Sequence, residues 1–201
     1  MKLYYSPGAC SLSPHIALCE ADLPFELVRV DLSAKKTADG GDFLAVNGDG
    51  YVPALGLDDG SVLTEGPAIV QYIADLAPAK NLAPANGTPD RYRLQSALNF
   101  ISTELHKSFS PLFSKTAGAD WKAAARATLK DRLAHLHGRM TRDYLLGDQF
   151  TVADGYLFTV LGWSKHVDFD LSPWPKLLAH QGRVAARPAV QRALREEGLL
   201  S

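Results

Sequence analysis

The chain contains few cysteines, with only two among 201 residues. Two cysteines exclude a small scaffold held together by several disulfides, and they exclude a four-ligand zinc site built on cysteine pairs. The sequence therefore predicts no metal site, and its cysteine usage indicates a reducing compartment.

Long apolar runs are absent as well. No segment approaches the roughly 20 consecutive apolar residues that a membrane span requires. The first twelve residues, MKLYYSPGACSL, lack the apolar core of a secretory signal. Together these absences predict a cytoplasmic protein with no membrane partner.

The net charge is only −1, but it is distributed unevenly along the chain. Residues 1–80 carry a net charge of −6, whereas residues 81–201 carry +5. This contrast suggests two units of different character. The basic residues are dispersed and are not interleaved with aromatic residues, so no nucleic-acid partner is expected.

The first unit, residues 1–80, alternates between strand and helix patterns. Its periodicity predicts a β-α-β segment, a β-hairpin turning at Asp59-Gly60, and a helix after the hairpin. The expected elements are strands Lys2–Ser6 and Phe25–Leu32, hairpin strands Val52–Asp58 and Ser61–Leu63, and helices Ser11–Ala21 and Gly66–Leu76. Only short, irregular helix is expected between residues 33 and 50.

Residues 81–89 read as a linker because they are rich in proline, glycine and asparagine. The pattern is helical almost throughout residues 90–201, so the fold class is α/β followed by all-α. The expected helices are Asp90–Lys107, Trp121–Leu145, Val152–Val167, Leu177–Ala185 and Val190–Glu197.

Cys10 is the first candidate for chemistry. It follows a strand and a Pro-Gly turn and stands where a helix begins, with Ser11 or Ser13 as a possible cap. Helix N-terminal N–H groups stabilise a thiolate, so a lowered pKa of Cys10 is expected. The spacing Cys10-Ser11-Leu12-Ser13 permits only a mixed disulfide with an external thiol. Cys19 lies too far along the helix to reach Cys10 and reads as a core residue.

Two further segments offer backbone and carboxylate groups to a ligand. A cis peptide bond before Pro53 would leave the N–H and C=O of Val52 available to an extended ligand backbone. Glu65 could accept from a ligand ammonium, and the N–H of Gly66 at a helix start could bind a carboxylate. An ordinary role for Glu65 as a first-turn acid fits the pattern equally well.

A polar stripe marks one face of the helix predicted from Asp90. At the spacing of a regular α-helix, Asn99, Thr103 and His106 share that face. Such a stripe most often faces solvent. Farther along, Thr151 and Asp154 form a capping-box pattern, to which we assign a structural role.

Five segments together resemble the cytosolic glutathione S-transferases, and in particular their bacterial beta class. They are Met1–Leu12, Tyr51–Leu55, Leu63–Tyr72, Thr103–Phe113 and Gln149–Val160. The resemblance covers essentially the whole chain. It implies a thioredoxin-like N-terminal domain followed by an all-helical C-terminal domain, assembled as a homodimer.

The resemblance also implies roles for individual residues. Cys10 and His106 match the two catalytic positions, and Pro53 matches the family's cis-proline. The positions expected to bind glutathione are Tyr5, Ser11, Lys35, Val52, Pro53, Glu65, Gly66, Asn99, Thr103, Glu104 and Lys107. Some of the polar helix face is contributed across the dimer in the family.

The implied activity is glutathione transfer to a small hydrophobic electrophile, with thiol-disulfide exchange through Cys10 as a second chemistry. Glutathione is a co-substrate here, and no metal is implied. Phe109, Phe113 and Trp163 are candidates for the electrophile's pocket. Two alternatives stay open on the sequence: a glutathione-dependent reductive dehalogenase or lyase of aromatic catabolites, and a non-catalytic glutathione-binding module.

Overall fold

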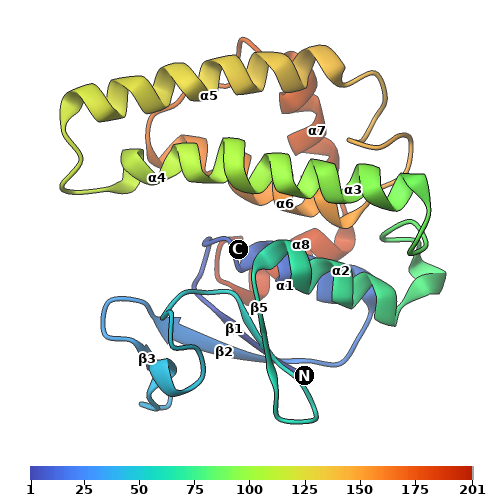
Figure 1. Cartoon of the computed structure of the whole chain (residues 1–201). Coiled ribbons are helices and arrows are strands. Elements are labelled where there is room, and N and C mark those ends of the chain that lie inside the picture. Colours follow the sequence, from blue (N-terminus) through green and yellow to red (C-terminus); the bar gives the residue numbers. More distant parts are fainter. Residues whose placement is uncertain (201) are drawn as a thin grey trace.

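Strand β1 (Lys2–Tyr5) lies at the centre of a five-stranded sheet in the computed structural model, which describes residues 1–200 (Figure 1). It pairs in parallel with β2 (Glu26–Asp31) and antiparallel with β4 (Ala54–Gly56). The short strands β3 (Lys36–Thr37) and β5 (Val62–Thr64) complete the order β3-β2-β1-β4-β5. The predicted β-α-β segment and hairpin are confirmed; β1, β2 and β4 are shorter than predicted, and β5 is shifted by one residue.

Different elements cover the two faces of the sheet. Helices α1 (Leu12–Ala21) and α2 (Gly66–Leu76) pack on the face turned toward the helical unit (Figure 1). On the opposite face a single turn of 3-10 helix places Phe43 against Val30, with both side chains buried. The first unit is thus the thioredoxin-like arrangement that the resemblance implies.

The second unit is helical, and its first continuous helical segment is longer than the predicted helix Asp90–Lys107. Helix α3, a π-helical stretch and α4 run on without a break to Phe113, whereas α5 ends at Arg139 instead of Leu145. The bounds are α3 Pro89–Phe100, π-helix Ile101–His106, α4 Lys107–Phe113, α5 Ala119–Arg139, α6 Val152–Gly162, 3-10 helix Trp163–His166, α7 Pro175–Ala185 and α8 Pro188–Glu196. Across residues 1–200, no helix combines the length and apolarity needed to cross a membrane.

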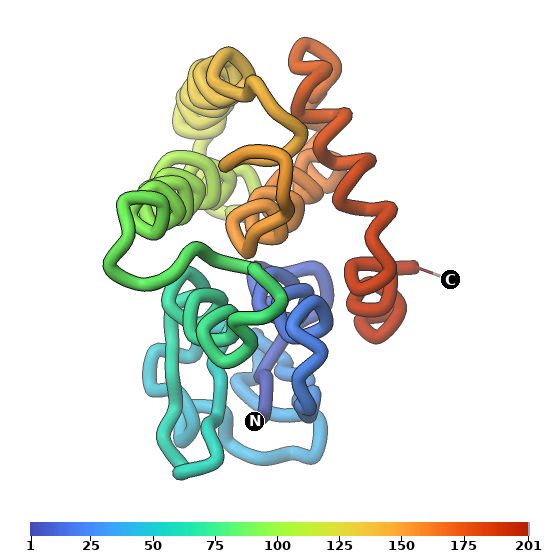
Figure 2. The backbone as a smooth tube through the Cα atoms, turned by 90° about the vertical axis from the view of Figure 1, so that its right-hand side faces the viewer, coloured from blue at the N-terminus to red at the C-terminus, as the bar shows by residue number. Residues whose placement is uncertain are grey.

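Helix α1 joins the two units because it is enclosed by both. Every residue of α1 except Glu20 is buried, and the helix contacts α2, α6 and α8. Figure 2 shows the C-terminal helix α8 beside α1, although the two lie at opposite ends of the sequence. On α6, Gly155 allows this packing, since a Cβ there would stand 3.3 Å from the side chain of Ile16.

Arg91 holds the connection between the units. Its buried guanidinium donates to both carboxylate oxygens of Asp75 on α2, at 2.8 and 2.7 Å, and to the carbonyl of Pro84. A bidentate pair of this kind is strong because both hydrogen bonds are charge-assisted. The segment that the sequence marks as a linker is therefore held against the end of α2.

The capping box at the start of α6 is part of a larger buried network. Asp154 is fully buried and accepts hydrogen bonds from the backbone and hydroxyl of Thr151 at 2.8 and 2.9 Å. Its other oxygen accepts from the backbone of Leu145 and contacts His180 Nε2 at 2.9 Å. Leu145, predicted as the end of α5, instead lies in the segment after it, since the backbone is already extended at Met140.

We expect Asp154→Ala to destabilise the protein by at least about 3 kcal/mol, because it leaves His180 and the start of α6 without their buried acceptor. Denaturant unfolding followed by circular dichroism measures this loss. Asp170→Ala is the matched control, since Asp170 is exposed and serves only a local turn with Ser172. Equal stability of the two variants would contradict a structural role for the network.

Candidate active site

Cys10 lies in the loop between β1 and α1, two residues before the first residue of the helix. Its thiol donates to the carbonyl of Val52 at 3.1 Å. The peptide bond between Val52 and Pro53 is cis, as the sequence suggests. The amide of Val52 has no hydrogen-bond partner within residues 1–200, so it is available to a ligand backbone beside the thiol.

The pKa of Cys10 contradicts the sequence expectation. Burial raises it from 9.0 to about 11, although backbone N–H groups of Cys10 and Ser11 act in the opposite direction. Desolvation disfavours the charged thiolate more than the helix N-terminus stabilises it. In the ligand-free protein Cys10 is therefore a neutral thiol that can donate a hydrogen bond.

The loop that carries Cys10 is held at three points. The buried hydroxyl of Ser11 lies within hydrogen-bond distance of the backbone of Ser6, at 3.1 and 3.2 Å. Trp163 Nε1 donates to the carbonyl of Gly8 at 2.9 Å, and Gly8 N–H donates to Glu197 at 2.8 Å. Ser11 makes no side-chain capping hydrogen bond to α1, which corrects its expected role as a cap. Its amide lowers the pKa of Cys10 in part, and its place in the glutathione site stays a prediction.

Glu65 stands at the start of α2 with an unusual backbone. Its φ is +65°, a region that side chains other than glycine adopt at an energetic cost. Its carboxylate makes no capping hydrogen bond to α2, so the ordinary role as a helix cap is not realised. It lies close enough to raise the pKa of Cys10 electrostatically. The first amide of α2 is that of Gly66, the residue that follows Glu65.

Two other expected binding residues are placed differently. Tyr5 is buried in the core beside the ring of His15, and its assignment to the ligand site stays a prediction. Lys35 has its ammonium 2.8 Å from the carbonyl of Gly50 and 5.4 Å from the centre of the Tyr51 ring. It therefore orders the loop that leads into Val52.

His106 closes the π-helical stretch and faces an aromatic environment. Its Nδ1 lies 2.7 Å from the hydroxyl of Tyr156, and its ring centre lies 4.7 Å from that of Trp163. Burial, with a smaller effect of Lys107, lowers the pKa of His106 to about 4. The imidazole is therefore neutral at physiological pH, which suits a hydrogen-bonding role more than that of a general base.

Tyr156 is the residue that sequence reasoning missed. It lies in a run of apolar residues on α6, where nothing in the pattern separates it from the core. In the structure it orients His106, and its hydroxyl is close enough to Cys10 and Glu65 for both to influence its pKa. Burial raises the pKa of Tyr156, so its hydroxyl stays protonated.

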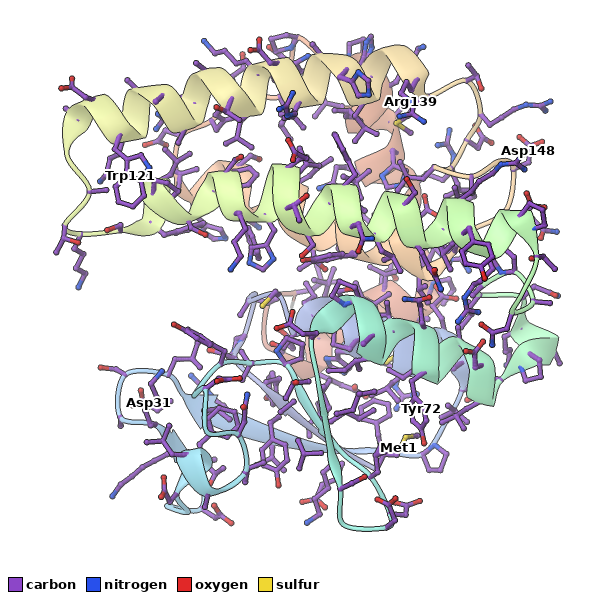
Figure 3. All side chains as sticks on the ribbon, viewed as in Figure 1. Met1, Asp31, Tyr72, Trp121, Arg139 and Asp148 are labelled. Carbon is purple, nitrogen blue, oxygen red and sulfur yellow. The ribbon has the colours of Figure 1, made fainter. Side chains whose placement is uncertain are left out.

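The remaining residues of the polar helix face separate into two groups. Lys107 is near enough to Cys10 to lower its pKa in part. Asn99 and Thr103 are exposed, and Glu104 forms an ion pair with Arg132 of α5 at 2.5 Å. Within one chain, no described contact connects those three with the neighbourhood of Cys10. Side chains occupy the space between this helix and the α1–α2 layer in Figure 3.

The three aromatic candidates for an electrophile pocket also differ. Phe109 is fully buried and packs against Trp163 and Phe169, so it belongs to the core. Trp163 is nearly buried, while Phe113 is 48% exposed at the end of α4. Only Phe113 therefore presents a large apolar surface.

Comparison with known proteins explains this arrangement. Residues 8–76 match the glutathione S-transferase N-terminal domain, and residues 100–188 match the glutathione S-transferase C-terminal domain. The chain belongs to the glutathione S-transferase family. Glutathione S-transferase GstA of Escherichia coli O157:H7 is 47% identical over 201 residues, which cover 99% of this chain and all of the relative.

Solved structures of the family agree with the fold throughout. A ternary complex of the bacterial transferase BphK is 66% identical, with a TM-score of 0.98 over 99% of this chain and 100% of that one. A sphingomonad glutathione S-transferase complexed with glutathione is 53% identical, with a TM-score of 0.96 and the same coverage. A beta-class transferase of Sphingomonas chungbukensis is 50% identical, with a TM-score of 0.96 over the whole of both chains. The chain is a bacterial-type member of the beta class.

The raised pKa of Cys10 predicts a steep pH dependence of its alkylation. At pH 7 only about one thiol in ten thousand is ionised, so the rate with iodoacetamide should rise about tenfold per pH unit from pH 7 to 10. Peptide mass spectrometry of the ligand-free protein separates Cys10 from the buried Cys19. A rate that levels off near pH 7 would show a thiolate and contradict this account.

Proposed function

We propose that this protein binds glutathione with its sulfur at Cys10 and conjugates it to small hydrophobic electrophiles. The observation that carries the proposal is the thiol of Cys10 on the carbonyl of Val52, whose amide has no hydrogen-bond partner within residues 1–200. The Glu65 carboxylate, which does not cap α2, is close enough to raise the pKa of Cys10. An extended peptide with an ammonium, a carboxylate and a thiol matches these groups. That the related sphingomonad transferase is complexed with glutathione supports the same ligand here.

The γ-glutamyl end of glutathione would lie at the start of α2. Glu65 accepts from the ligand's ammonium, and Gly66 N–H donates to its carboxylate at the positive end of the helix. The cysteinyl part then lies along Val52, whose amide donates to it. In this arrangement the thiol of Cys10 turns from the Val52 carbonyl to the sulfur of glutathione.

Conjugation requires a stabilised glutathione thiolate. Cys10 supplies a neutral S–H donor, and His106, with Nδ1 on Tyr156, can direct its other ring nitrogen into the site as a second donor. The positive charge of Lys107 favours the same thiolate. The glutathione thiol proton leaves to solvent, and the thiolate attacks an electrophilic carbon and displaces its leaving group.

Thiol-disulfide exchange is the second chemistry of the proposed site. Cys10 loses its proton and attacks the glutathionyl sulfur of an external mixed disulfide, which releases the other partner as a thiolate. A second glutathione thiolate then attacks the Cys10–glutathione disulfide, giving glutathione disulfide and free Cys10. Because this route needs ionised Cys10, we expect it to be slow at neutral pH and faster in alkali.

A homodimer would explain the predicted role of the polar helix residues that have no described contact with the neighbourhood of Cys10 within one chain. Asn99 of α3 and Thr103 of the π-helical stretch are exposed, and they could contact the site of a second copy. Glu104 forms an ion pair with Arg132, and it would contribute to the site of the second copy through that pair. The assembly follows from the family resemblance, and we propose it on that basis.

An assay with a panel of chlorinated nitroaromatic compounds and glutathione tests the proposed reaction. Conjugation releases one chloride for each glutathione conjugate formed. A reductive dehalogenase would instead release chloride with formation of glutathione disulfide and no stable conjugate. Reversible glutathione binding with no product from any compound would favour a non-catalytic binding module.

Glu65→Gln should weaken glutathione binding by at least about tenfold, because it removes the charge-assisted hydrogen bond to the ligand ammonium. Isothermal titration calorimetry measures the dissociation constant. Glu26→Gln is the matched control, since Glu26 pairs with Lys2 on the sheet. Unchanged binding in Glu65→Gln, with the fold intact, would refute the assignment of Glu65.

A further inference from the structure

A second cluster of reactive side chains lies at the interface of α1 and α8. His15 and Cys19 are one helical turn apart on α1, so they share a face. Glu196, the last residue of α8, meets them from the other helix. His15 is fully buried and Cys19 nearly so, while the Glu196 side chain is 32% exposed and leads out to solvent.

Each of the three side chains places one possible ligand atom near those of the other two. A nitrogen of His15, the sulfur of Cys19 and a carboxylate oxygen of Glu196 all lie within 4.8 Å of one another. His15 Nε2 and Glu196 Oε2 are 2.7 Å apart. In a tetrahedral zinc site, with metal–ligand bonds of about 2.0–2.3 Å, neighbouring ligand atoms stand about 3.3–3.8 Å apart. To reach these separations, His15 Nε2 and Glu196 Oε2 would move apart, and the widest pair would close by up to about 1 Å.

The outer contacts of the cluster suit a metal site as well. The other ring nitrogen of His15, Nδ1, lies 3.0 Å from the buried carboxylate of Glu197. A carboxylate behind a ligating histidine fixes the ring and its tautomer and strengthens it as a ligand. The second oxygen of Glu197 accepts from Gly8 N–H, so the cluster is connected to the loop that carries Cys10.

The contacts of Glu196 also suit a metal ligand. Both ring nitrogens of His15 face carboxylates, Nε2 that of Glu196 and Nδ1 that of Glu197. Arg192 donates to the other oxygen of Glu196 at 2.8 Å and leaves one oxygen for the ion.

We propose that His15, Cys19 and Glu196 bind a divalent transition-metal ion of the zinc type, with water as the fourth ligand. Thiolate and imidazole ligands select zinc or cobalt over magnesium and calcium. The site departs from the sequence expectation of no metal because one of its ligands comes from the far end of the chain. An ion here joins α1 to α8 and stabilises the folded protein.

Cobalt(II) tests the ligand set directly, because a thiolate ligand gives a sulfur-to-cobalt charge-transfer band and tetrahedral geometry gives visible absorption. The chain's two cysteines provide a matched pair. We expect both signals in the unmodified protein and in Cys10→Ala, and their loss in Cys19→Ala. No charge-transfer band in the unmodified protein, or a band that survives in Cys19→Ala, would overturn the proposal.

Zinc affinity and stability provide a second readout. In calorimetry with Zn²⁺, Glu196→Gln should bind at least about tenfold more weakly than the unmodified protein, whereas Glu26→Gln should bind equally. The unfolding temperature should rise with Zn²⁺ and fall back with a chelator, and Cys19→Ala should lose this response. Equal zinc affinity of Glu196→Gln and the unmodified protein would contradict the site.

Discussion

The enclosure of helix α1 is the constraint on which the rest of the structure depends. One face of α1 packs with α2 above the sheet, and the others contact α6 and α8 of the helical unit. The one residue of α1 that is not buried, Glu20, has its carboxylate held by Arg187 on both oxygens. A helix fixed in this way fixes the residue two positions before its start, so the position of Cys10 is set by both units together.

The same enclosure decides the chemistry of the thiol. A helix N-terminus favours a thiolate, but the protein that surrounds Cys10 excludes enough water to raise its pKa to about 11. His106 is affected in the same way and stays neutral. Both groups are therefore uncharged in the ligand-free protein. In the conjugation that we propose, the negative charge would belong to glutathione, the nucleophile.

Local signals in the sequence predicted much of the fold. Asp59-Gly60 located the hairpin and the Thr151–Asp154 pattern located the start of α6, because turn and cap chemistry act within a few residues. The family motifs predicted the cis bond before Pro53, which the structure has, and they are the basis of the roles that we propose for Cys10 and Glu65.

What the sequence could not predict depends on contacts between distant segments. Burial of Cys10 by surrounding protein reversed the expected direction of its pKa. Tyr5 and Phe109 belong to the core, and Ser11 is bound to Ser6. Tyr156 reaches His106 only through the packing of α6 against the π-helical stretch, which a regular helical spacing does not describe.

The intact mass of the protein after incubation with glutathione disulfide tests most directly whether the sulfur of glutathione meets Cys10. We predict an increase of one glutathione that a reductant removes, that forms faster at pH 9 than at pH 7, and that is absent in Cys10→Ala. No adduct on the unmodified protein, or an equal adduct on Cys10→Ala, would contradict the account.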